Sequence, residues 1–237
     1  MVMDAVYWFG VRGYEGQVTA LWARLCGHAQ SVLEIGGNVG LFTTLGGLAC
    51  RGRYTVVEPV PAIAGVLRSN LGRNGITGVQ VLEVAAVPGS LARDVSLNVP
   101  DERRAAPVGA HLTEGVEVSG RSSHQVIQVR GEPFIQLIDG CDLIKIDAEG
   151  IEAELLDGAY ETLVARRPTL LIEVLPEAIR LGQLLSRLAH DAGYVIYVVP
   201  EYGDERIVVV PPAEFTSALP QRHRSKDVVL AVGPLPV

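Results

Sequence analysis

The sequence predicts an α/β fold in which a largely parallel sheet is covered by helices on both faces. Short runs rich in β-branched residues recur at 31–36, 53–58, 79–84, 142–147, 169–174 and 194–199. Most of them are separated by segments with helical spacing of apolar residues. The runs are also nearly continuously apolar, which is typical of strands that helices bury on both sides.

Each predicted element has a local signal. A helix is expected at 14–28, ahead of the first strand. Helical apolar spacing then predicts helices at 38–50, 61–74, 150–166 and 176–193, each following one of the strands. A last pair of strands, at 206–210 and 226–232, is expected to close the sheet as an antiparallel edge.

The length of 237 residues and 25.3 kDa is ordinary for one domain. We expect a single domain over 1–237, with an N-terminal helical segment at 1–30 and a core formed by 31–88 and 132–237. The alternation of strands and helices breaks at 89–131, where two possible strands flank a Gly-, Ser- and Arg-rich middle. Long irregular insertions are commonly functional, so we expect a substrate loop or lid there.

Composition excludes several classes of partner. Lys and Arg number 20 against 27 Asp and Glu, giving a net charge of −7 and a pI near 5.3. This balance attracts neither nucleic acid nor an anionic membrane surface. The three cysteines have no C-x-x-C spacing, and the N-terminus lacks the positive charge of a signal peptide. We therefore expect a cytoplasmic protein with reduced thiols and no membrane span, and a homodimer by default.

A glycine-rich turn follows the first strand, in "VLEIGGNVG". Its residues Glu34, Gly36, Asn38 and Gly40 lie where the chain passes into a helix. Glycines let the backbone approach a ligand, and the helix start offers unpaired N–H groups. The alternative is a tight turn with no ligand. Glu58 ends the second strand, 24 residues after Glu34, where an acid can accept hydrogen bonds from both hydroxyls of a ribose.

The pattern of this turn distinguishes two cofactors. A dinucleotide fold would show G-x-G-x-x-G, which admits a pyrophosphate. Here the pattern is E-x-G-G-x-x-G, and Glu34 would repel a pyrophosphate. The same acid could receive the ammonium group of an amino-acid-like ligand, directly or through water. S-adenosylmethionine fits this pattern better than a dinucleotide.

Several segments together resemble the FkbM family of S-adenosylmethionine-dependent methyltransferases. They are "VLEIGGNVGLFTT", "VVEP", "LRSNLGRNGI", "EVAAVPG", "LIKIDAEGIEAELLDG" and "PTLLIEV", within a stretch from about Gly13 to Val174. The resemblance implies a Rossmann-like, seven-stranded class I methyltransferase sheet. It also implies methylation of an oxygen, most often a hydroxyl of a sugar or natural product.

The resemblance assigns roles to single residues. The methionine part of the cofactor would be surrounded by Glu34, Gly36, Asn38 and Gly40. Glu58 would hold the ribose, and Ala85 and Ala86 would lie beside the adenine. Tyr14 and Glu15 would close over the cofactor or the substrate. Tyr14 and Glu15 could equally be a helix start with a surface acid. The family often has Asp at position 34 and Ala at position 37, and we expect the turn to tolerate glycine at position 37 in place of the family's alanine.

Three charges alternate in "IKIDAEG", which places Lys145, Asp147 and Glu149 on one side of an extended chain. Glu173 ends the next strand, so Asp147 and Glu173 would meet at one site if the two strands are neighbours. Asp147 could instead cap a helix beginning near Gly150, with Glu149 as an acid of its first turn. For Lys145 we expect an ion pair that positions Asp147; the smaller possibility is a base with a lowered pKa.

A neutral alcohol needs a base, or a metal that stabilises the developing alkoxide. Asp147 and Glu173, with waters and a substrate diol, would suit Mg²⁺ or a similar hard cation. Three histidines in irregular segments, His111, His124 and His223, could touch the substrate.

These observations predict an S-adenosylmethionine-dependent O-methyltransferase acting on a hydroxyl of a saccharide or glycosylated natural product, with a divalent metal and an acidic centre of Asp147, Glu149 and Glu173. One rival is an N- or C-methyltransferase on a small metabolite, without metal. Another is a catalytically silent protein that binds cofactor or a partner. A dinucleotide oxidoreductase fits the sequence least.

Overall fold

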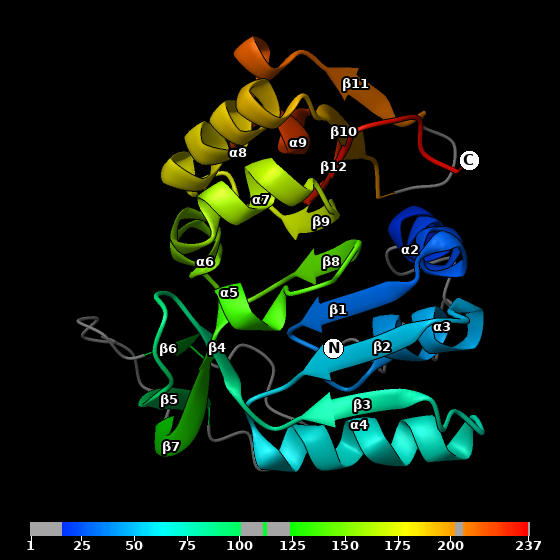
Figure 1. Cartoon of the computed structure of the whole chain (residues 1–237), viewed down its shortest axis with the longest axis vertical. Coiled ribbons are helices and arrows are strands. Elements are labelled where there is room, and N and C mark those ends of the chain that lie inside the picture. The colour runs from blue at the N-terminus through cyan, green and yellow to red at the C-terminus, as the bar shows by residue number, and fades with distance from the viewer. Residues whose placement is uncertain (1–15, 101–110, 113–123, 202–205, 237) are drawn as a thin grey trace.

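The computed structural model describes residues 16–100, 111–112, 124–201 and 206–236, which form two sheets and the helices around them (Figure 1). The main sheet has the strand order β11-β10-β12-β9-β8-β1-β2-β3. Its strands are β1 (Ser31–Ile35), β2 (Arg53–Val57), β3 (Val79–Leu82), β8 (Leu143–Ile146), β9 (Thr169–Glu173), β10 (Val195–Val199), β11 (Val208–Val210) and β12 (Asp227–Ala231). All six strands predicted from the β-branched runs are present, and the α/β class is confirmed.

The C-terminal part of the sheet differs from the expectation in two ways. β12 pairs antiparallel with both β9 and β10, so it lies inside the sheet and not at its edge. β11 forms the antiparallel edge on β10, which gives the described sheet eight strands where seven were expected. Every residue of β12 is buried, because neighbouring strands cover both of its edges and side chains pack on both of its faces.

The two faces of the sheet are covered by different helices (Figure 1). One face packs against α2 (Gly16–His28), α3 (Leu41–Ala49) and α4 (Pro61–Arg73), and the other against α5 (Phe134–Leu137), α6 (Glu152–Gly158), α7 (Tyr160–Arg166) and α8 (Ile179–Ala192). The alternation of side chains along β1 explains this division. Leu33 and Ile35 belong to the α5–α8 core, whereas Val32 belongs to the α2–α4 core.

Helix α8 shows how the sequence dictates this packing. Its buried residues recur at the spacing of one helical face: Leu181, Leu184, Leu185, Leu188, Ala189 and Ala192. Gly193 then ends the helix in the left-handed conformation, with φ of 72°. The short helix α9 (Leu219–Arg222) and the 3₁₀ turn η2 (Pro212–Glu214) lie between β11 and β12 in the chain.

A second, four-stranded sheet lies beyond the carboxyl ends of the parallel strands (Figure 1). Its order is β4-β7-β5-β6, with β4 (Ala85–Val87), β5 (Arg93–Pro100), β6 (His111–Leu112) and β7 (His124–Pro133). The two strands suspected within 89–131 are β5 and β7, so much of this insertion is regular structure. Residues 101–110 and 113–123, on which the expectation of a lid also depends, lie outside the described residues.

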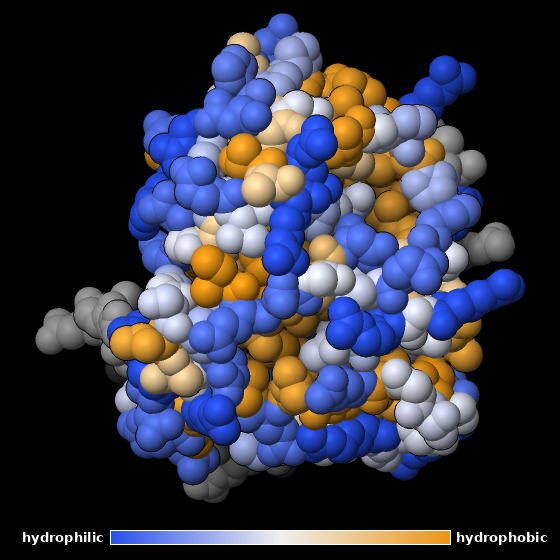
Figure 2. Space-filling view, viewed as in Figure 1, coloured by the Kyte–Doolittle hydropathy of each residue, from blue (hydrophilic) through white to orange (hydrophobic). Residues whose placement is uncertain are grey.

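Two further expectations concern membrane-spanning helices and the thiols. None of the helices that the structure describes is long and apolar enough to cross a membrane. Cys26, Cys50 and Cys141 are free thiols, as expected. The face of the molecule seen in Figure 2 carries hydrophilic residues over much of its area, with hydrophobic residues gathered in separate groups between them.

Candidate active site

The turn after β1 is shaped by contacts within the protein. Gly36 has φ of +82°, and a Cβ atom added to it would lie 1.9 Å from the backbone oxygen of Asp147. Only glycine fits there, because the chains leaving β1 and β8 touch at this point. A Cβ on Gly37 would meet Val56 at 2.4 Å and Leu67 at 2.7 Å, both buried side chains. Glycine at position 37 avoids both of these contacts.

Glu58, directly after β2, stabilises the same turn through hydrogen bonds. Its two carboxylate oxygens accept hydrogen bonds from the backbone N–H of Asn38 at 2.9 Å and of Val60 at 3.0 Å. Glu58 is only 5% exposed, and burial raises its pKa to about 7 against the opposing effect of these two hydrogen bonds. The ionised carboxylate still has acceptor capacity for two hydroxyl groups of a ligand.

A pocket of about 700 Å³ opens between this turn and the second sheet; we call it the glycine-turn pocket. It is lined by residues that the sequence predicted for the cofactor, among them Gly36, Asn38, Glu58, Ala85 and Ala86. Leu97 of β5 and Ile63 of α4 add apolar walls that sequence reasoning missed.

A neighbouring pocket of about 800 Å³ collects ionisable side chains, and we call it the acidic pocket. Its charged residues are Glu34, Lys145, Asp147, Glu149, Glu173 and Lys226. It shares Gly36, Asn38, Asp147 and Glu149 with the glycine-turn pocket. The carboxyl ends of β1, β8 and β9 therefore bring the predicted acidic residues to one site, because these strands are adjacent and parallel.

Glu34 lies on the α2–α4 face of β1, opposite Lys145 of β8 in the strand register. Its carboxylate accepts a hydrogen bond of 2.6 Å from the hydroxyl of Tyr54. Burial raises the pKa of Glu34 to about 7, and the Lys145 ammonium opposes that rise. At neutral pH the residue is thus poised between its neutral and ionised forms.

Lys145 and Asp147 form the ion pair that the alternation of charges predicted. The Lys145 ammonium lies 3.0 Å from the Asp147 carboxylate and 4.6 Å from the centre of the Phe42 ring. Burial disfavours the ionised form of Asp147, but the charge of Lys145 prevails and lowers its pKa below the ordinary value. Asp147 is therefore held as a carboxylate, and a carboxylate with a lowered pKa is a weak base.

Glu173 lies beside Asp147 at the end of β9. Its carboxylate pairs with the ammonium of Lys226 at 2.7 Å, and both Glu173 and Asp147 line the acidic pocket. Burial, followed by the nearby charge of Asp147, raises the pKa of Glu173, while Lys226 acts in the opposite direction. The two carboxyl groups thus differ in basicity, and Glu173 is the better proton acceptor of the pair.

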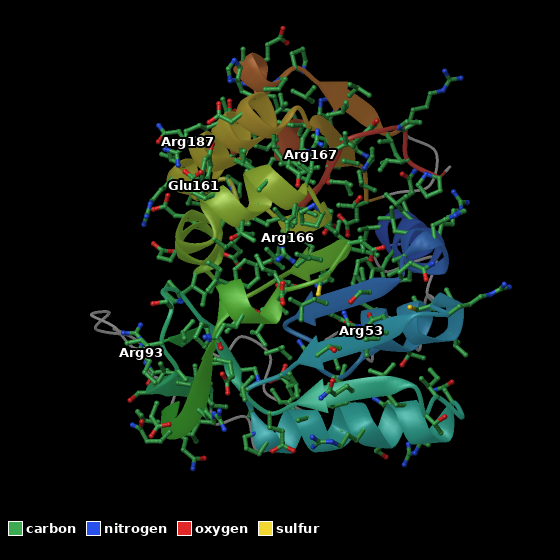
Figure 3. All side chains as sticks on the ribbon, in the orientation of Figure 1. Arg53, Arg93, Glu161, Arg166, Arg167 and Arg187 are labelled. Carbon is green, nitrogen blue, oxygen red and sulfur yellow. The ribbon has the colours of Figure 1, made fainter. Side chains whose placement is uncertain are left out.

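Sequence reasoning did not identify Lys226 as a site residue, although the small number of lysines could have indicated it. Lys145 and Lys226 are the two lysines of the chain, whose other basic residues among the 20 are all arginines. The arginines labelled in Figure 3 belong to β2, β5, the end and C-cap of α7, and α8, and none of them lines the acidic pocket. Both lysines line the acidic pocket.

The loop between β8 and α6 is organised by a second residue that the sequence did not reveal. Glu152 is buried, and its carboxylate accepts hydrogen bonds from the backbone N–H of Ala148 at 2.8 Å and of Gly150 at 3.1 Å. This loop holds Glu149, with φ of 54°, at the boundary of both pockets. Because α6 begins at Glu152, neither Asp147 as its cap nor Glu149 as its first-turn acid describes the structure.

The donor set does not fit a divalent cation. Among the described residues, no group of three His, Cys, Asp or Glu side chains is placed to hold a metal ion. Asp147 and Glu173 are each already paired with a lysine ammonium, at 3.0 Å and 2.7 Å. A divalent ion would have to displace or repel these charges. The structure thus gives no support to the expected Mg²⁺.

The structure does not test the roles predicted for the remaining residues. Tyr14 and Glu15 lie outside the described residues. His111 and His124 belong to strands β6 and β7 of the second sheet, where both pair with β5. His223 follows α9 and lines neither the glycine-turn pocket nor the acidic pocket. The substrate role expected for the histidines stays a prediction.

Comparisons with known proteins concern the family and the fold of the chain. A family model described as the methyltransferase FkbM domain matches residues 34–196. Among solved structures, a methyltransferase FkbM from Methylobacillus flagellatus KT is similar to 85% of this chain, with 16% identity and a TM-score of 0.52, and the chain spans 43% of that protein's length. An O-methyltransferase from Bacillus cereus in complex with SAH is also similar, with 13% identity and a TM-score of 0.47. The similarity covers 91% of this chain and 79% of that protein. No curated protein sequence matches the chain.

Proposed function

The chain belongs to the FkbM methyltransferase family, and on that premise we propose that it is an S-adenosylmethionine-dependent O-methyltransferase acting on a hydroxyl of a saccharide or glycosylated natural product. The observation that carries the proposal is the pair of adjoining pockets. One offers an acid and apolar walls for a nucleoside, and the other offers carboxylates of unequal basicity. Asp147 and Glu149 border both, so a methyl donor in the first pocket would face an acceptor in the second.

The residues of the glycine-turn pocket fit the proposed cofactor. Glu58 would accept hydrogen bonds from the ribose hydroxyls, and Ala85, Ala86 and Leu97 would enclose the adenine. Glu34 and the backbone around Gly36 would lie near the methionine part. When bound, S-adenosylmethionine supplies a methyl group on a sulfonium, which is a good leaving group.

In the acidic pocket the protein must align an acceptor hydroxyl and remove its proton. We assign the base to Glu173, because its raised pKa makes it a better proton acceptor than Asp147. Asp147, kept ionised by Lys145, would orient the acceptor by accepting a hydrogen bond from a neighbouring hydroxyl. Glu149 at the boundary of the pockets would do the same from the other side. Acceptors with several hydroxyls, such as saccharides, suit a site rich in carboxylate acceptors.

A test begins with the cofactor. Isothermal titration with S-adenosylhomocysteine should show binding, and NAD should show none. Purified protein is then incubated with S-adenosylmethionine and panels of saccharides, glycosylated natural products, amines and carbon acids. An O-methylated product, identified by mass and NMR, supports the proposal.

Substitutions at two glutamates test whether Glu173 is the base. Glu173→Gln should lower kcat by about 10²–10⁴-fold, the usual contribution of a general base, and leave the affinity for S-adenosylhomocysteine unchanged. Glu161→Gln, at an exposed position on α7 labelled in Figure 3, is the matched control and should behave as the wild type. Methylation confined to nitrogen or carbon would favour the second candidate, a small-metabolite methyltransferase. Cofactor binding with no acceptor in any panel would favour a catalytically silent protein.

A further inference from the structure

We propose that Lys226 is a positioning residue for Glu173, and that Lys226 and Lys145 together supply the positive charge that a divalent cation would otherwise provide at this centre. The inference rests on the proposed function, because it takes Glu173 as the base of the methyl transfer. It goes beyond that function in assigning a role to a residue outside the recognised motifs, directly ahead of β12.

The first observation is a cluster of four charged groups. Lys145 contacts Asp147 at 3.0 Å, and Lys226 contacts Glu173 at 2.7 Å. Lys145 and Asp147 lie at the end of β8, Glu173 ends β9 and Lys226 directly precedes β12, and these three strands are adjacent. Each carboxylate thus has its own ammonium partner, and the charge of Asp147 acts on Glu173.

The second observation is that the backbone fixes Lys226 relative to Glu173. The N–H of Val174, the residue after Glu173, donates a hydrogen bond of 2.7 Å to the carbonyl of Lys226. The next residue, Asp227, pairs with Glu173 in the strand register. The insertion of β12 beside β9 therefore determines where the Lys226 ammonium can reach.

The third observation is the chain's use of lysine. Its two lysines both stand in the acidic pocket, although 20 residues of the chain are Lys or Arg. An ammonium is a compact charge that can contact one carboxylate oxygen and leave the other accessible, whereas a guanidinium tends to engage both oxygens. A base that must also contact its acceptor is better served by the ammonium.

Several groups face Glu173 from the elements packed against it. Asp147 and Lys145 lie on β8, and Lys226 and Asp227 lie on β12. Glu149 and Glu177 line the pockets to which Glu173 contributes. Apart from the lysines these neighbours are acidic, so the loss of Lys226 would leave Glu173 beside carboxylates without its nearest cation.

The step assigned to this centre balances as follows. The acceptor oxygen forms a bond to the methyl carbon as the sulfur–carbon bond breaks, which leaves a neutral thioether. The hydroxyl proton passes to Glu173 and is later released to water. Lys226 neither gains nor loses a proton; it keeps the Glu173 carboxylate ionised and turned towards the acceptor.

The test compares two variants that remove the charge of Lys226, Lys226→Met and Lys226→Gln, with Lys226→Arg, which keeps the charge. Arg222→Met on α9 is the control, because it removes an exposed positive charge elsewhere. Because the base must be ionised, the acidic limb of the pH profile of kcat/KM should move up by about 1–3 pH units in the Met and Gln variants. It should stay near its wild-type position in Lys226→Arg and Arg222→Met. The affinity for S-adenosylhomocysteine should be unchanged in all four, which also shows that they fold.

A second readout does not require activity. The carboxyl carbon of Glu173, labelled with carbon-13 and assigned by its loss in Glu173→Gln, should titrate at higher pH in Lys226→Met than in the wild type. In parallel, wild-type activity should persist in excess chelator. An unmoved Glu173 titration in folded Lys226→Met, or activity that chelator abolishes and Mg²⁺ restores, would overturn the inference. Absence of any hydroxyl methylation by the wild type would instead refute the proposed function, and the titration would still decide the role of Lys226.

Discussion

At the scale of single residues, the site is constrained most tightly where two strands leave the sheet. Gly36 and Asp147 follow β1 and β8, which are paired neighbours. The backbone oxygen of Asp147 occupies the space where a side chain at position 36 would begin. The glycine that sequence patterns associate with a ligand is thus also required by the protein itself.

Gly36→Ala should accordingly be severely destabilising. The new Cβ would lie 1.9 Å from a backbone oxygen at a φ of +82°, and neither strand can move without breaking the pairing of β1 and β8. We expect a loss of about 3 kcal/mol or more in the free energy of unfolding, measured by urea denaturation. Gly65→Ala, in helix α4 with no atom within 4 Å of its added Cβ, is the control and should be neutral or stabilising by up to about 1 kcal/mol.

Glu58 makes the cofactor site sensitive to pH. Its pKa is raised to about 7 by burial, and the ionised form is the stronger acceptor for hydroxyl groups beyond its two backbone hydrogen bonds. The affinity for S-adenosylhomocysteine should therefore fall as pH decreases below 7, by up to tenfold per pH unit. Calorimetric titrations from pH 5.5 to 8.5 would measure this change.

Two variants assign that pH dependence. In Glu58→Gln it should be strongly reduced, and in Glu34→Gln it should persist, although the pKa of Glu34 is also about 7. The opposite outcome would place the sensitivity at Glu34. Stability has the reverse sign, because a carboxyl group whose pKa is higher in the folded chain than its ordinary 4.5 lowers the free energy of unfolding as pH rises from about 4.5 to 7.

At the scale of elements, the loop from β8 to α6 depends on one buried carboxylate. Glu152 holds the N–H groups of Ala148 and Gly150 and so fixes the loop that carries Glu149 between the two pockets. Secondary-structure propensity alone would start the helix earlier. Because these N–H groups are bound to a side chain, they do not enter the helix, and α6 begins at Glu152.

Glu152→Ala should release this loop. Two backbone donors would lose their acceptor, so we expect a loss of about 1–3 kcal/mol in the free energy of unfolding and weaker binding of S-adenosylhomocysteine. Thermal unfolding and calorimetry would measure the two effects. Glu154→Ala is matched to it, because Glu154 is also an acid in the first turn of α6, but its side chain is 42% exposed and pairs with Arg180. Equal effects of the two substitutions would refute the role assigned to Glu152.

At the scale of the whole molecule, the sheet is completed by the last part of the chain. The family model ends at residue 196, before β12, yet β12 lies between β9 and β10 and carries Lys226 just ahead of it. We propose that the core and the second sheet form one folding unit, since β4 follows β3 directly and pairs with β7.

A chain ending after Pro200 should therefore not fold. It would lack the strand that pairs with β9 and β10 on their inner edges, and two buried strands would be left with unpaired backbone groups. Circular dichroism and urea denaturation should show no cooperative transition in the truncated chain and one in the full chain. Val209→Thr, at a 61% exposed position on the edge strand β11, should change stability by less than about 0.5 kcal/mol. Cooperative unfolding of the truncated chain would contradict this account.

The sequence alone determined the parallel strands, the helices between them, and the acids at the ends of β1, β2, β8 and β9, because periodicity and residue type are local properties. It also predicted the pair of Lys145 and Asp147, whose side chains share one face of a strand. The tertiary structure decided the rest. Strand order placed β12 inside the sheet, which brought Lys226 to Glu173 from a distant part of the chain. The unequal pKa values of Asp147 and Glu173 likewise follow from burial and from neighbours on other strands, which no local pattern encodes.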